Sequence, residues 1–409
     1  MSVVCRCCGA ALRDVFVDLG KSPLCERFLA GDELNAMEPF FPLKVWVCHE
    51  CYLVQLQSYV APDDIFSHYA YFSSFSSSWL VHARRYVEMA CGRFALGAQS
   101  KVVEVASNDG YLLQYFVERG VPCLGIDPAA NVVEAAGEKG VRTLVRFFGE
   151  ATAREVVDSE GQADLVLGNN VLAHVPDLHD FVTGLAVLLA PGGVLTMEFP
   201  HLARLIEGNQ FDTIYHEHFS YLSLAVVQRL FAMHGLRVFD VEELKSHGGS
   251  LRVFACHEDA PHETLPSVAA LLEAEAREGL TSMATYAAFR ERVIDTKNAL
   301  VAFLIQARQE GVRVAAYGAP GKGNTLLNYA GIREDLIAYA VDRNPFKHGK
   351  YCPGTQIPIH PVEMVNEDKP GLLVILPWNL TDEIVTQMAH VREWGCRFVR
   401  PIPELTIID

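Results

Sequence analysis

The sequence predicts an α/β protein with two parallel sheets, preceded by a small module that a metal ion holds together. Short apolar runs alternate with helical stretches between residues 101 and 199, and again between residues 313 and 399. This alternation is typical of βαβ units, in which helices join parallel strands. We therefore expect a zinc-binding module over 1–75, a central Rossmann-like domain over 76–260, a helical connector over 261–300 and a C-terminal α/β Rossmann-like domain over 301–409.

The N-terminal module contains two cysteine pairs, Cys5-x-x-Cys8 and Cys48-x-x-Cys51. Four thiolates complete the tetrahedral shell of a structural zinc, and a segment this short has too little apolar core to fold unaided. Cys7 competes with Cys8 as a ligand, but the x-x spacing favours Cys8. Redox pairs or buried thiols are the alternative interpretation.

Length and charge limit the possible function. A chain of 409 residues with net charge −16 predicts several packed domains and argues against binding to nucleic acid, which needs clustered Lys and Arg. We find neither an N-terminal signal pattern nor a run of about 20 apolar residues. We expect a cytoplasmic monomer that does not bind membranes.

The expected elements follow in chain order. An amphipathic helix from Ser78 to about Ala98 leads into the central domain, and a helical connector runs from about Thr264 to Gly311. The central strands are Lys101–Ala106, Val121–Ile126, Asp164–Leu167, Gly193–Phe199, Leu236–Glu242 and Ser250–Cys256. The C-terminal elements are strands Arg313–Tyr317, Leu336–Val341, Gly371–Leu376 and Arg397–Val399 and a helix over Glu383–Trp394.

The segment Val102–Gly110 is a strand that ends in a turn with a single glycine. A dinucleotide needs three glycines for close approach of a pyrophosphate, whereas S-adenosylmethionine has no phosphate, so this turn favours S-adenosylmethionine over a nicotinamide cofactor. Asp127 follows about 20 residues later, where a carboxylate binds ribose hydroxyls, although an N-terminal helix cap is the alternative. Together with Asn169–Val175 and Pro191–Gly193, these features resemble class I methyltransferases. The resemblance implies that the cofactor binds Glu104, Ser107, Asn108, Gly110, Asp127, Pro128, Asn169 and Asn170.

The segment Ile214–Tyr221 is the densest group of titratable residues, with two His, one Glu and two Tyr. It is not a zincin site, because the order His-Glu-His lacks the spacing of HExxH. An extended segment would put His216 and His218 on one side, whereas a turn would bring Tyr215 and His218 together. Both arrangements stay open, and a purely structural cluster is the alternative to a catalytic one.

These motifs, together with His247–Arg252 and Tyr317–Asn324, resemble the bacterial sugar C-methyltransferases of antibiotic deoxysugar pathways over nearly the whole chain. The resemblance implies a class I methyltransferase fold and methylation of a dTDP-linked 4-keto-deoxysugar at C3, although some relatives act at C5. It implies that His218 is the base and that the sugar is surrounded by Tyr215, Glu217, His174, Tyr69 and Tyr71. Ser73, Ser74 and Lys322 are the expected substrate-binding residues.

The chemistry of these side chains agrees with that reaction. A side chain with a pKa near 7 can remove a proton next to a ketone if the enolate oxygen is stabilised, and methyl transfer to the carbon then depends on positioning. Gly318–Asn324 is not a P-loop, and either a diphosphate-binding turn or a plain strand-to-helix turn explains it. O- or N-methylation of a nucleotide sugar, and a non-catalytic nucleotide-sugar binding protein, are the alternative functions.

Overall fold

The computed structural model describes residues 3–66 and 72–409, which form two compact units. Unit 1 comprises Met1–Arg13, Cys48–Leu202 and Phe219–Thr281; unit 2 comprises Asp14–Val47, Ala203–His218 and Ser282–Asp409. Each unit therefore draws on three separate stretches of chain. The four domain ranges expected from the sequence divide the chain into contiguous segments, and they stay a prediction.

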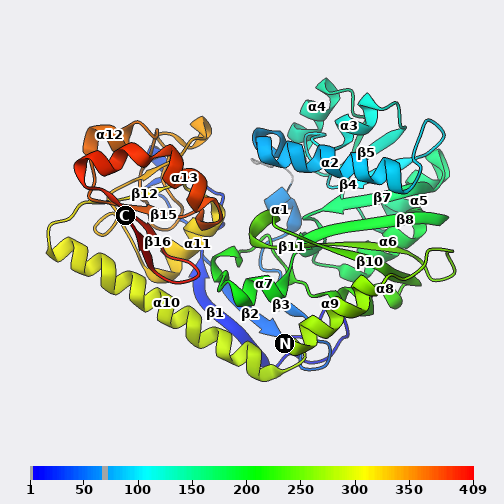
Figure 1. Ribbon diagram of the computed structural model, residues 1–409, viewed down its shortest axis with the longest axis horizontal. Coiled ribbons are helices and arrows are strands. Elements are labelled where there is room, and N and C mark those ends of the chain that lie inside the picture. The colour runs from blue at the N-terminus through cyan, green and yellow to red at the C-terminus, as the bar shows by residue number, and fades with distance from the viewer. Residues whose placement is uncertain (1–2, 67–71) are drawn as a thin grey trace. The chain divides into compact units, whose positions relative to one another are not determined.

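Unit 1 is built on a seven-stranded sheet with the order β10-β11-β8-β7-β4-β5-β6 (Figure 1). The neighbours from β8 to β6 are parallel, while β11 is antiparallel to β8 and to β10. The strands are β4 (Val102–Val105), β5 (Cys123–Asp127), β6 (Thr143–Val145), β7 (Ala163–Asn169), β8 (Leu189–Pro200), β10 (Leu236–Leu244) and β11 (Ser250–His257).

Helices cover both faces of this sheet, as a doubly wound sheet requires. One face buries a core in which α2 and α3 pack on the central strands, with Tyr86, Phe116 and Phe254 among the largest buried side chains. The helices of unit 1 are α1 (Pro62–Phe66), α2 (Ser77–Arg93), α3 (Leu113–Glu118), α4 (Ala130–Glu138), α5 (Glu150–Glu160), α6 (Leu178–Leu188), α8 (Leu224–Ala232) and α9 (Pro266–Arg277).

Short elements complete unit 1. The strands β3 (Val54–Leu56) and β9 (Ser220–Tyr221) pair antiparallel. Three 3-10 turns lie at the carboxyl edge of the large sheet or next to it, namely η2 (Ser73–Phe75), η3 (Leu172–His174) and η5 (Ser246–Gly248).

Unit 2 contains a six-stranded sheet with the order β14-β13-β12-β15-β16-β17, in which only β17 is antiparallel to its neighbour. Numbered along the chain, this is the order 3-2-1-4-5-6 of a doubly wound nucleotide-binding sheet. The strands are β12 (Val314–Tyr317), β13 (Ala340–Val341), β14 (Ile359–His360), β15 (Leu372–Ile375), β16 (Arg397–Arg400) and β17 (Thr406–Ile408).

The remaining elements of unit 2 come from all three of its stretches. The antiparallel strands β1 (Asp14–Ser22) and β2 (Phe41–Val47) form a ribbon on which the long helix α10 (Met283–Gln309) packs. The others are η1 (Gly31–Glu33), α7 (Leu202–Glu207), η4 (Phe211–Thr213), α11 (Gly321–Ala330), η6 (Pro345–Lys347), α12 (Met364–Asp368), η7 (Trp378–Leu380), α13 (Thr381–Gln387) and η8 (Ala389–Trp394).

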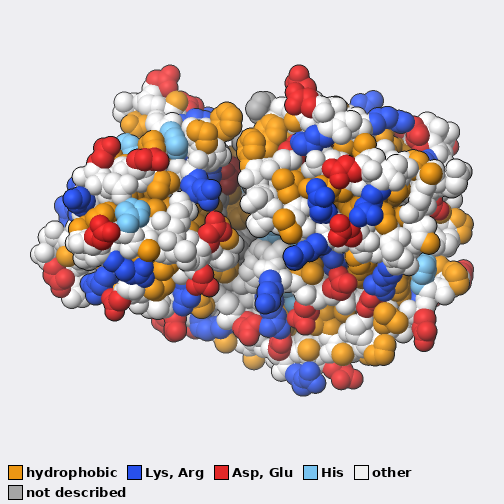
Figure 2. All heavy atoms as spheres, turned by 45° about the horizontal axis from the view of Figure 1, so that its top comes forward, with side chains coloured by type: hydrophobic (Ala, Val, Ile, Leu, Met, Phe, Trp, Pro, Cys, Tyr) orange, Lys and Arg blue, Asp and Glu red, His pale blue; other side chains and the backbone are white. Residues whose placement is uncertain are grey.

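All the strands expected from the sequence are present, with different lengths at some positions. The strand expected over Leu336–Val341 is reduced to β13, and the helix expected over Glu383–Trp394 divides into α13 and η8. Among the described helices, none combines the length and apolarity needed to cross a membrane. On the face shown in Figure 2, Lys and Arg side chains are interspersed with Asp and Glu, and the whole chain carries net charge −16.

Candidate active site

The four predicted zinc ligands come together in unit 1. The sulfurs of Cys5, Cys8, Cys48 and Cys51 all lie within 4.8 Å of one another, and the Cys5–Cys51 and Cys8–Cys48 pairs are each 3.5 Å apart. Zn–S bonds of about 2.3 Å in a tetrahedron need similar sulfur separations. Cys8, rather than Cys7, is the fourth member, as the spacing predicted.

The turn after β4 has an unusual backbone conformation. Ala106, Asn108 and Gly110 have positive φ angles of 58°, 49° and 74°. A Cβ on Gly110 would lie 3.0 Å from Cγ2 of Val141, so both the φ angle and the available space require glycine at this position.

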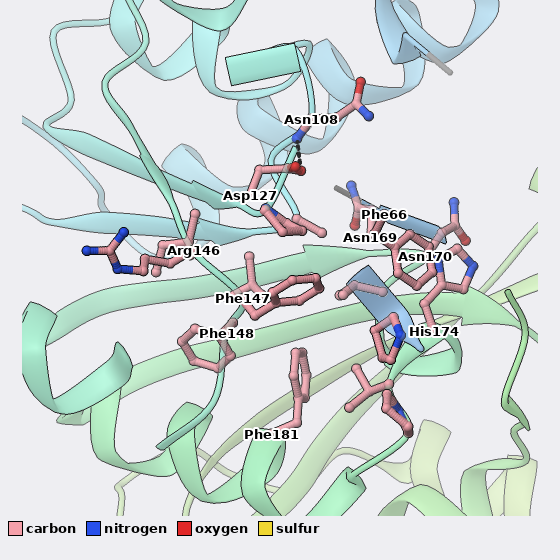
Figure 3. A pocket seen from close by; sticks show the side chains of 18 of the residues that line it. Phe66, Asn108, Asp127, Arg146, Phe147, Phe148, Asn169, Asn170, His174 and Phe181 are labelled. Atoms are coloured by element: carbon pink, nitrogen blue, oxygen red, sulfur yellow. Dashed lines mark hydrogen bonds between the residues drawn. The ribbon is translucent and has the colours of Figure 1, made fainter. Parts of the chain in front are cut away.

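Asp127 ends β5 beside this turn and is 6% exposed. Its Oδ2 accepts a hydrogen bond of 2.9 Å from the N–H of Asn108 (Figure 3). Its Oδ1 accepts one of 2.9 Å from the N–H of Ala129. Burial raises the pKa of Asp127, and the two N–H donors partly offset this effect. Ala129 is the N-cap residue of α4 and no side chain caps that helix, so the helix-cap alternative is not what the structure shows. Asp127 also lines a pocket.

That pocket has a volume of about 380 Å³ and opens at the carboxyl edge of the sheet. Its lining follows the strand order: Arg146 and Phe147 come after β6, Asp127 and Pro128 after β5, Ala106 and Asn108 after β4, and Asn169 and Asn170 at the end of β7. Ligands of α/β sheets bind at such edges, and the volume suits a ligand of cofactor size.

The pocket is lined by several of the predicted cofactor residues, whereas Glu104, Ser107 and Gly110 are not part of its lining. Asn108, Asp127, Pro128, Asn169, Asn170, Ser73 and His174 line it. Glu104 and Ser107 are fully buried, and burial raises the pKa of Glu104 well above its usual range. The N–H groups of Ser73 and Ser74 donate to Asn108 and Asp109, at 3.0 and 3.3 Å.

Sequence reasoning missed the aromatic wall of the pocket, formed by Phe66, Trp79, Phe147, Phe148 and Phe181. Phe147 is 41% exposed, which leaves an apolar ring open toward a ligand, as Figure 3 shows. A stack of Phe66 on His174, with ring centroids 5.7 Å apart, forms another part of the wall. The run Arg146–Phe148 after a third strand was the available signal, but that strand was not predicted.

Residues 214–218 of the predicted catalytic cluster lie in unit 2, whereas Tyr221 lies in unit 1. Tyr215 to His218 form a turn, so the extended arrangement is wrong. The N–H of His218 donates to the carbonyl of Tyr215 at 2.9 Å, and the two rings have centroids 4.0 Å apart. Nδ1 of His218 lies 2.7 Å from the carbonyl oxygen of Thr213. Because a carbonyl can only accept, Nδ1 carries the hydrogen and Nε2 carries the lone pair when the ring is neutral.

His216 has a different environment from His218. It is 3% exposed, its Nε2 lies 3.3 Å from the carbonyl of Pro42, and its ring packs edge-on against Phe41. Burial lowers the pKa of His216. Glu217 is 8% exposed in the same turn, whereas Tyr69 and Tyr71 lie outside the described residues.

Lys322 lies in unit 2 at the start of α11, next to the switch between β12 and β15. Its Nζ lies 4.5 Å from the centroid of the Trp378 ring and donates to Asn379. The Nε1 of Trp378 donates to Oδ2 of Asp212 at 2.7 Å. Asp212 is fully buried, and this raises its pKa to about 7 against the lowering effect of the Lys322 cation.

The comparisons with known proteins agree with this geometry. Family models match a putative zinc binding domain over residues 5–66, a methyltransferase domain over 68–241 and a C-methyltransferase C-terminal domain over 245–403. The C-methyltransferase NovU of Streptomyces niveus is 38% identical over 408 residues, a match that covers 99% of this chain and 96% of NovU.

More distant likenesses cover less of the chain. A ubiquinone biosynthesis O-methyltransferase of Rhodopseudomonas palustris (strain BisB18) is 26% identical over 117 residues, covering 27% of this chain and 46% of that protein. The solved structure of magnesium protoporphyrin IX methyltransferase (ChlM) from Synechocystis PCC 6803 with bound SAH is 14% identical, covers 44% of this chain and 83% of that chain, and has a TM-score of 0.35.

The sheet, the cysteine cluster and the matched models define a class I S-adenosylmethionine-dependent methyltransferase with a zinc-binding N-terminus. The predicted fold class is thereby confirmed, as are the two predicted cofactors, S-adenosylmethionine and zinc. Within that class, the chain belongs to the C-methyltransferase family that includes NovU.

Proposed function

We propose that this C-methyltransferase acts on C3 of a dTDP-linked 4-keto-deoxysugar, with His218 as the base. The substrate class comes from the motif resemblance, and the family supplies transfer of a methyl group to carbon. A carbon next to a ketone is acidic enough for an imidazole to deprotonate it when the enolate oxygen is stabilised. The ketone is therefore what makes carbon methylation possible.

The observation that carries this proposal is the hydrogen bond between Nδ1 of His218 and the carbonyl of Thr213 at 2.7 Å. It fixes the ring in the tautomer whose Nε2 can accept a proton, as a second group does for catalytic histidines elsewhere. His216 is the nearest rival, but it is buried against Pro42 and Phe41 and packs like a structural residue.

The motif resemblance implies that His174 and Tyr215 surround the sugar. We assign His174 and Tyr215 to stabilising the enolate oxygen and Glu217 to contact with the sugar. Tyr69 and Tyr71 keep their predicted place beside the substrate.

We place the methyl donor in the pocket of unit 1, with its ribose at Asp127 and its adenine against Phe147, Phe148 and Phe181. The two oxygens of Asp127 have lone pairs beyond those used by Asn108 and Ala129, so they can accept from ribose hydroxyls. Glu104 and Ser107 keep their predicted role at the cofactor. The bound donor supplies a methyl group on a positively charged sulfur.

The reaction then balances in two steps. The C3–H bond breaks, its proton goes to Nε2 of His218, and its electron pair delocalises onto the ketone oxygen. The enolate carbon next forms a bond to the methyl carbon, while the pair of the breaking C–S bond stays on sulfur and leaves it neutral. Each step needs the reacting atoms held about 3 to 3.5 Å apart.

We propose that Lys322 binds the diphosphate of the substrate. It follows a strand-to-helix turn in a sheet with the nucleotide-binding strand order, and the first N–H groups of α11 point out of the same turn. Ser73 and Ser74 remain candidate substrate contacts.

Hydrogen exchange at C3 tests the proposal directly. Incubation with dTDP-4-keto-2,6-dideoxyglucose in D₂O, without donor, should introduce deuterium at C3 in the wild type, and His216→Ala should retain this exchange if it folds. His218→Ala should lose it. An O- or N-methyltransferase would show no enzyme-dependent exchange, and exchange that persists in His218→Ala would rule out this residue as the base.

A further inference from the structure

The turn Ser246–Gly249 between β10 and β11 has no role in the proposed chemistry, yet its conformation is costly. His247, Gly248 and Gly249 have φ angles of 54°, 90° and 116° in succession. Glycine adopts such angles easily, whereas a histidine at positive φ is strained. His247 is nevertheless kept at this position and lines the pocket of unit 1.

A buried carboxylate holds the turn in place. Oε1 of Glu198 accepts from the hydroxyl of Ser246 at 2.9 Å, and its Oε2 lies 2.7 Å from Nη2 of Arg252 and 2.8 Å from Nε2 of His82. Glu198 is 1% exposed. The N–H of Gly249 also donates to the carbonyl of Ser246 at 2.8 Å.

The same carboxylate fixes the neighbouring pocket wall. His82 stacks on Trp79, with ring centroids 4.7 Å apart, and Trp79 also stacks on Tyr111 at 5.9 Å. The ring of His247 meets Trp79 edge-on at 5.0 Å. Trp79, Tyr111 and His247 all line the pocket, so the Glu198 network determines the shape of one of its ends.

Sheet order shows which part of the donor this end would receive. From Phe147 after β6, the lining passes Asp127 after β5, the turn after β4 and Asn169 on β7, and then reaches the turn before β11. The donor is linear, with adenine, ribose, sulfur and an amino acid in that order. If ribose lies at Asp127 and adenine at Phe147, the amino acid points toward Trp79 and His247.

The charges of the pocket lining point to His247 as the anion-binding side chain at this end. The donor's amino acid carries a carboxylate, and the lining contains four aspartates but, among its described side chains, only Arg146, His174 and His247 as basic groups. Arg146 belongs to the adenine end, and in Figure 3 its guanidinium extends away from Phe147. His174 is assigned to the sugar. His247 is therefore the side chain suited to an anion at the far end.

We infer that His247, presented by the Glu198-anchored turn, binds the carboxylate of the methionyl part of S-adenosylmethionine. This inference rests on the proposed placement of the donor in the pocket of unit 1. His247 would then determine specificity for the donor, because removing its imidazole should lower the affinity for ligands that carry the amino acid and should not change the affinity for ligands that lack it.

Calorimetry with two ligands tests this assignment. His247→Gly removes the imidazole and also relieves the positive φ angle, so folding should be preserved. We expect its affinity for S-adenosylmethionine to fall by about fivefold to tenfold, as for a partly exposed charge-assisted hydrogen bond, and its affinity for 5′-methylthioadenosine to stay unchanged. Ser246→Ala removes only the hydrogen bond between the turn and Glu198, so it should also lower the affinity for S-adenosylmethionine alone, but by a smaller factor. It is the second variant if His247→Gly fails to fold.

Two controls separate the possible failures. Lys245→Ala changes an exposed charge in the neighbouring position and should affect neither ligand. Asp127→Ala should weaken both ligands; if it weakens neither, the placement of the donor is wrong. If Asp127→Ala behaves as expected but His247→Gly weakens both ligands equally, or neither, the assignment of His247 is overturned.

Discussion

The two sheets of this protein place an aspartate in the same way and surround it differently. In unit 1, Asp127 accepts from the N–H of Asn108 in the turn after the first strand and from the N–H two residues after itself. In unit 2, Asp342 accepts from Ala319 and from Asn344 at 2.8 Å each, which is the same arrangement. These bonds are a property of the doubly wound fold and do not identify a ligand.

The surroundings of the two aspartates at the sheet edges differ. Asp127 faces a pocket of about 380 Å³. Near Asp342, Lys347 places its Nζ 4.0 Å from that carboxylate and 3.9 Å from Glu26, and a Cβ on Gly321 would lie 2.9 Å from Oε1 of Glu26. Beside Asp342, the second edge thus holds ion pairs of the protein itself. A shared strand order therefore defines where a ligand can bind, and the side chains decide whether it does.

The largest expected effect concerns the zinc site, which only unit 1 contains among the described residues. Removing zinc with a chelator, or with Cys48→Ser, should destabilise unit 1 by more than about 5 kcal/mol, since structural zinc in small modules supplies folding free energy of about 10 kcal/mol or more. Limited proteolysis should then cut unit 1 before unit 2.

Cys7→Ser is the matched control, because Cys7 is a fully buried thiol of the same knuckle that lies outside the four-sulfur cluster. It should keep one zinc per chain by metal analysis. Protein that lacks zinc but retains its full stability would contradict a structural role for the cluster.

The next effect concerns His218 in unit 2. His218→Ala should reduce kcat by about 10² to 10⁴, the range for a lost general base, while the affinity for S-adenosylmethionine stays within about twofold. Single-turnover kinetics and calorimetry measure the two quantities. A fall in donor affinity of the same size as the fall in rate would show that His218 supports the donor pocket instead.

Sequence alone predicted those parts of the molecule that local patterns determine. The zinc ligands follow from cysteine spacing, and strands such as Val102–Val105 follow from buried apolar runs. The strand β6 (Thr143–Val145) was missed because it has three residues, none of them fully buried, at the edge of the sheet. Consequently the pocket aromatics that follow it, such as Phe147, could not be placed.

Long-range pairing was beyond local patterns for a different reason. The ribbon of β1 and β2 lies in the N-terminal stretch but belongs to unit 2, where it packs on α10 more than 200 residues later. The turn that joins Tyr215 to His218 also depends on tertiary context, since the sequence permitted both a turn and a strand. The local pattern gave the residue types of the site, and nonlocal packing gave their orientation.

A third prediction uses the two aspartates as a matched pair. Asp127→Ala and Asp342→Ala each remove two hydrogen bonds to backbone N–H groups, so both should lower stability by a similar amount, about 1 to 3 kcal/mol. Only Asp127→Ala should also weaken S-adenosylmethionine binding, by about 1 to 3 kcal/mol in calorimetry, because only Asp127 faces the pocket. Equal donor affinities in the two variants would remove the functional difference between the sheet edges.

The smallest expected effect concerns two lysines of unit 2 that differ in their partners. Lys347 lies beside two carboxylates, whereas Lys322 donates to the neutral Asn379 and lies over the ring of Trp378, with buried Asp212 as its nearby acid. If Lys322 binds the substrate diphosphate, Lys322→Met should raise the KM for the nucleotide sugar by about threefold to tenfold, a range typical of one charged contact that is partly exposed. It should leave kcat nearly unchanged, because the contact is the same in the ground state and the transition state. Lys347→Met makes the same change of charge and should leave that KM within about twofold. Steady-state kinetics at fixed donor concentration measures both variants. An equal rise in KM for the two variants would mean that the total charge of unit 2, and not a specific contact, attracts the nucleotide sugar. The edge of the second sheet would then have no specific site at Lys322.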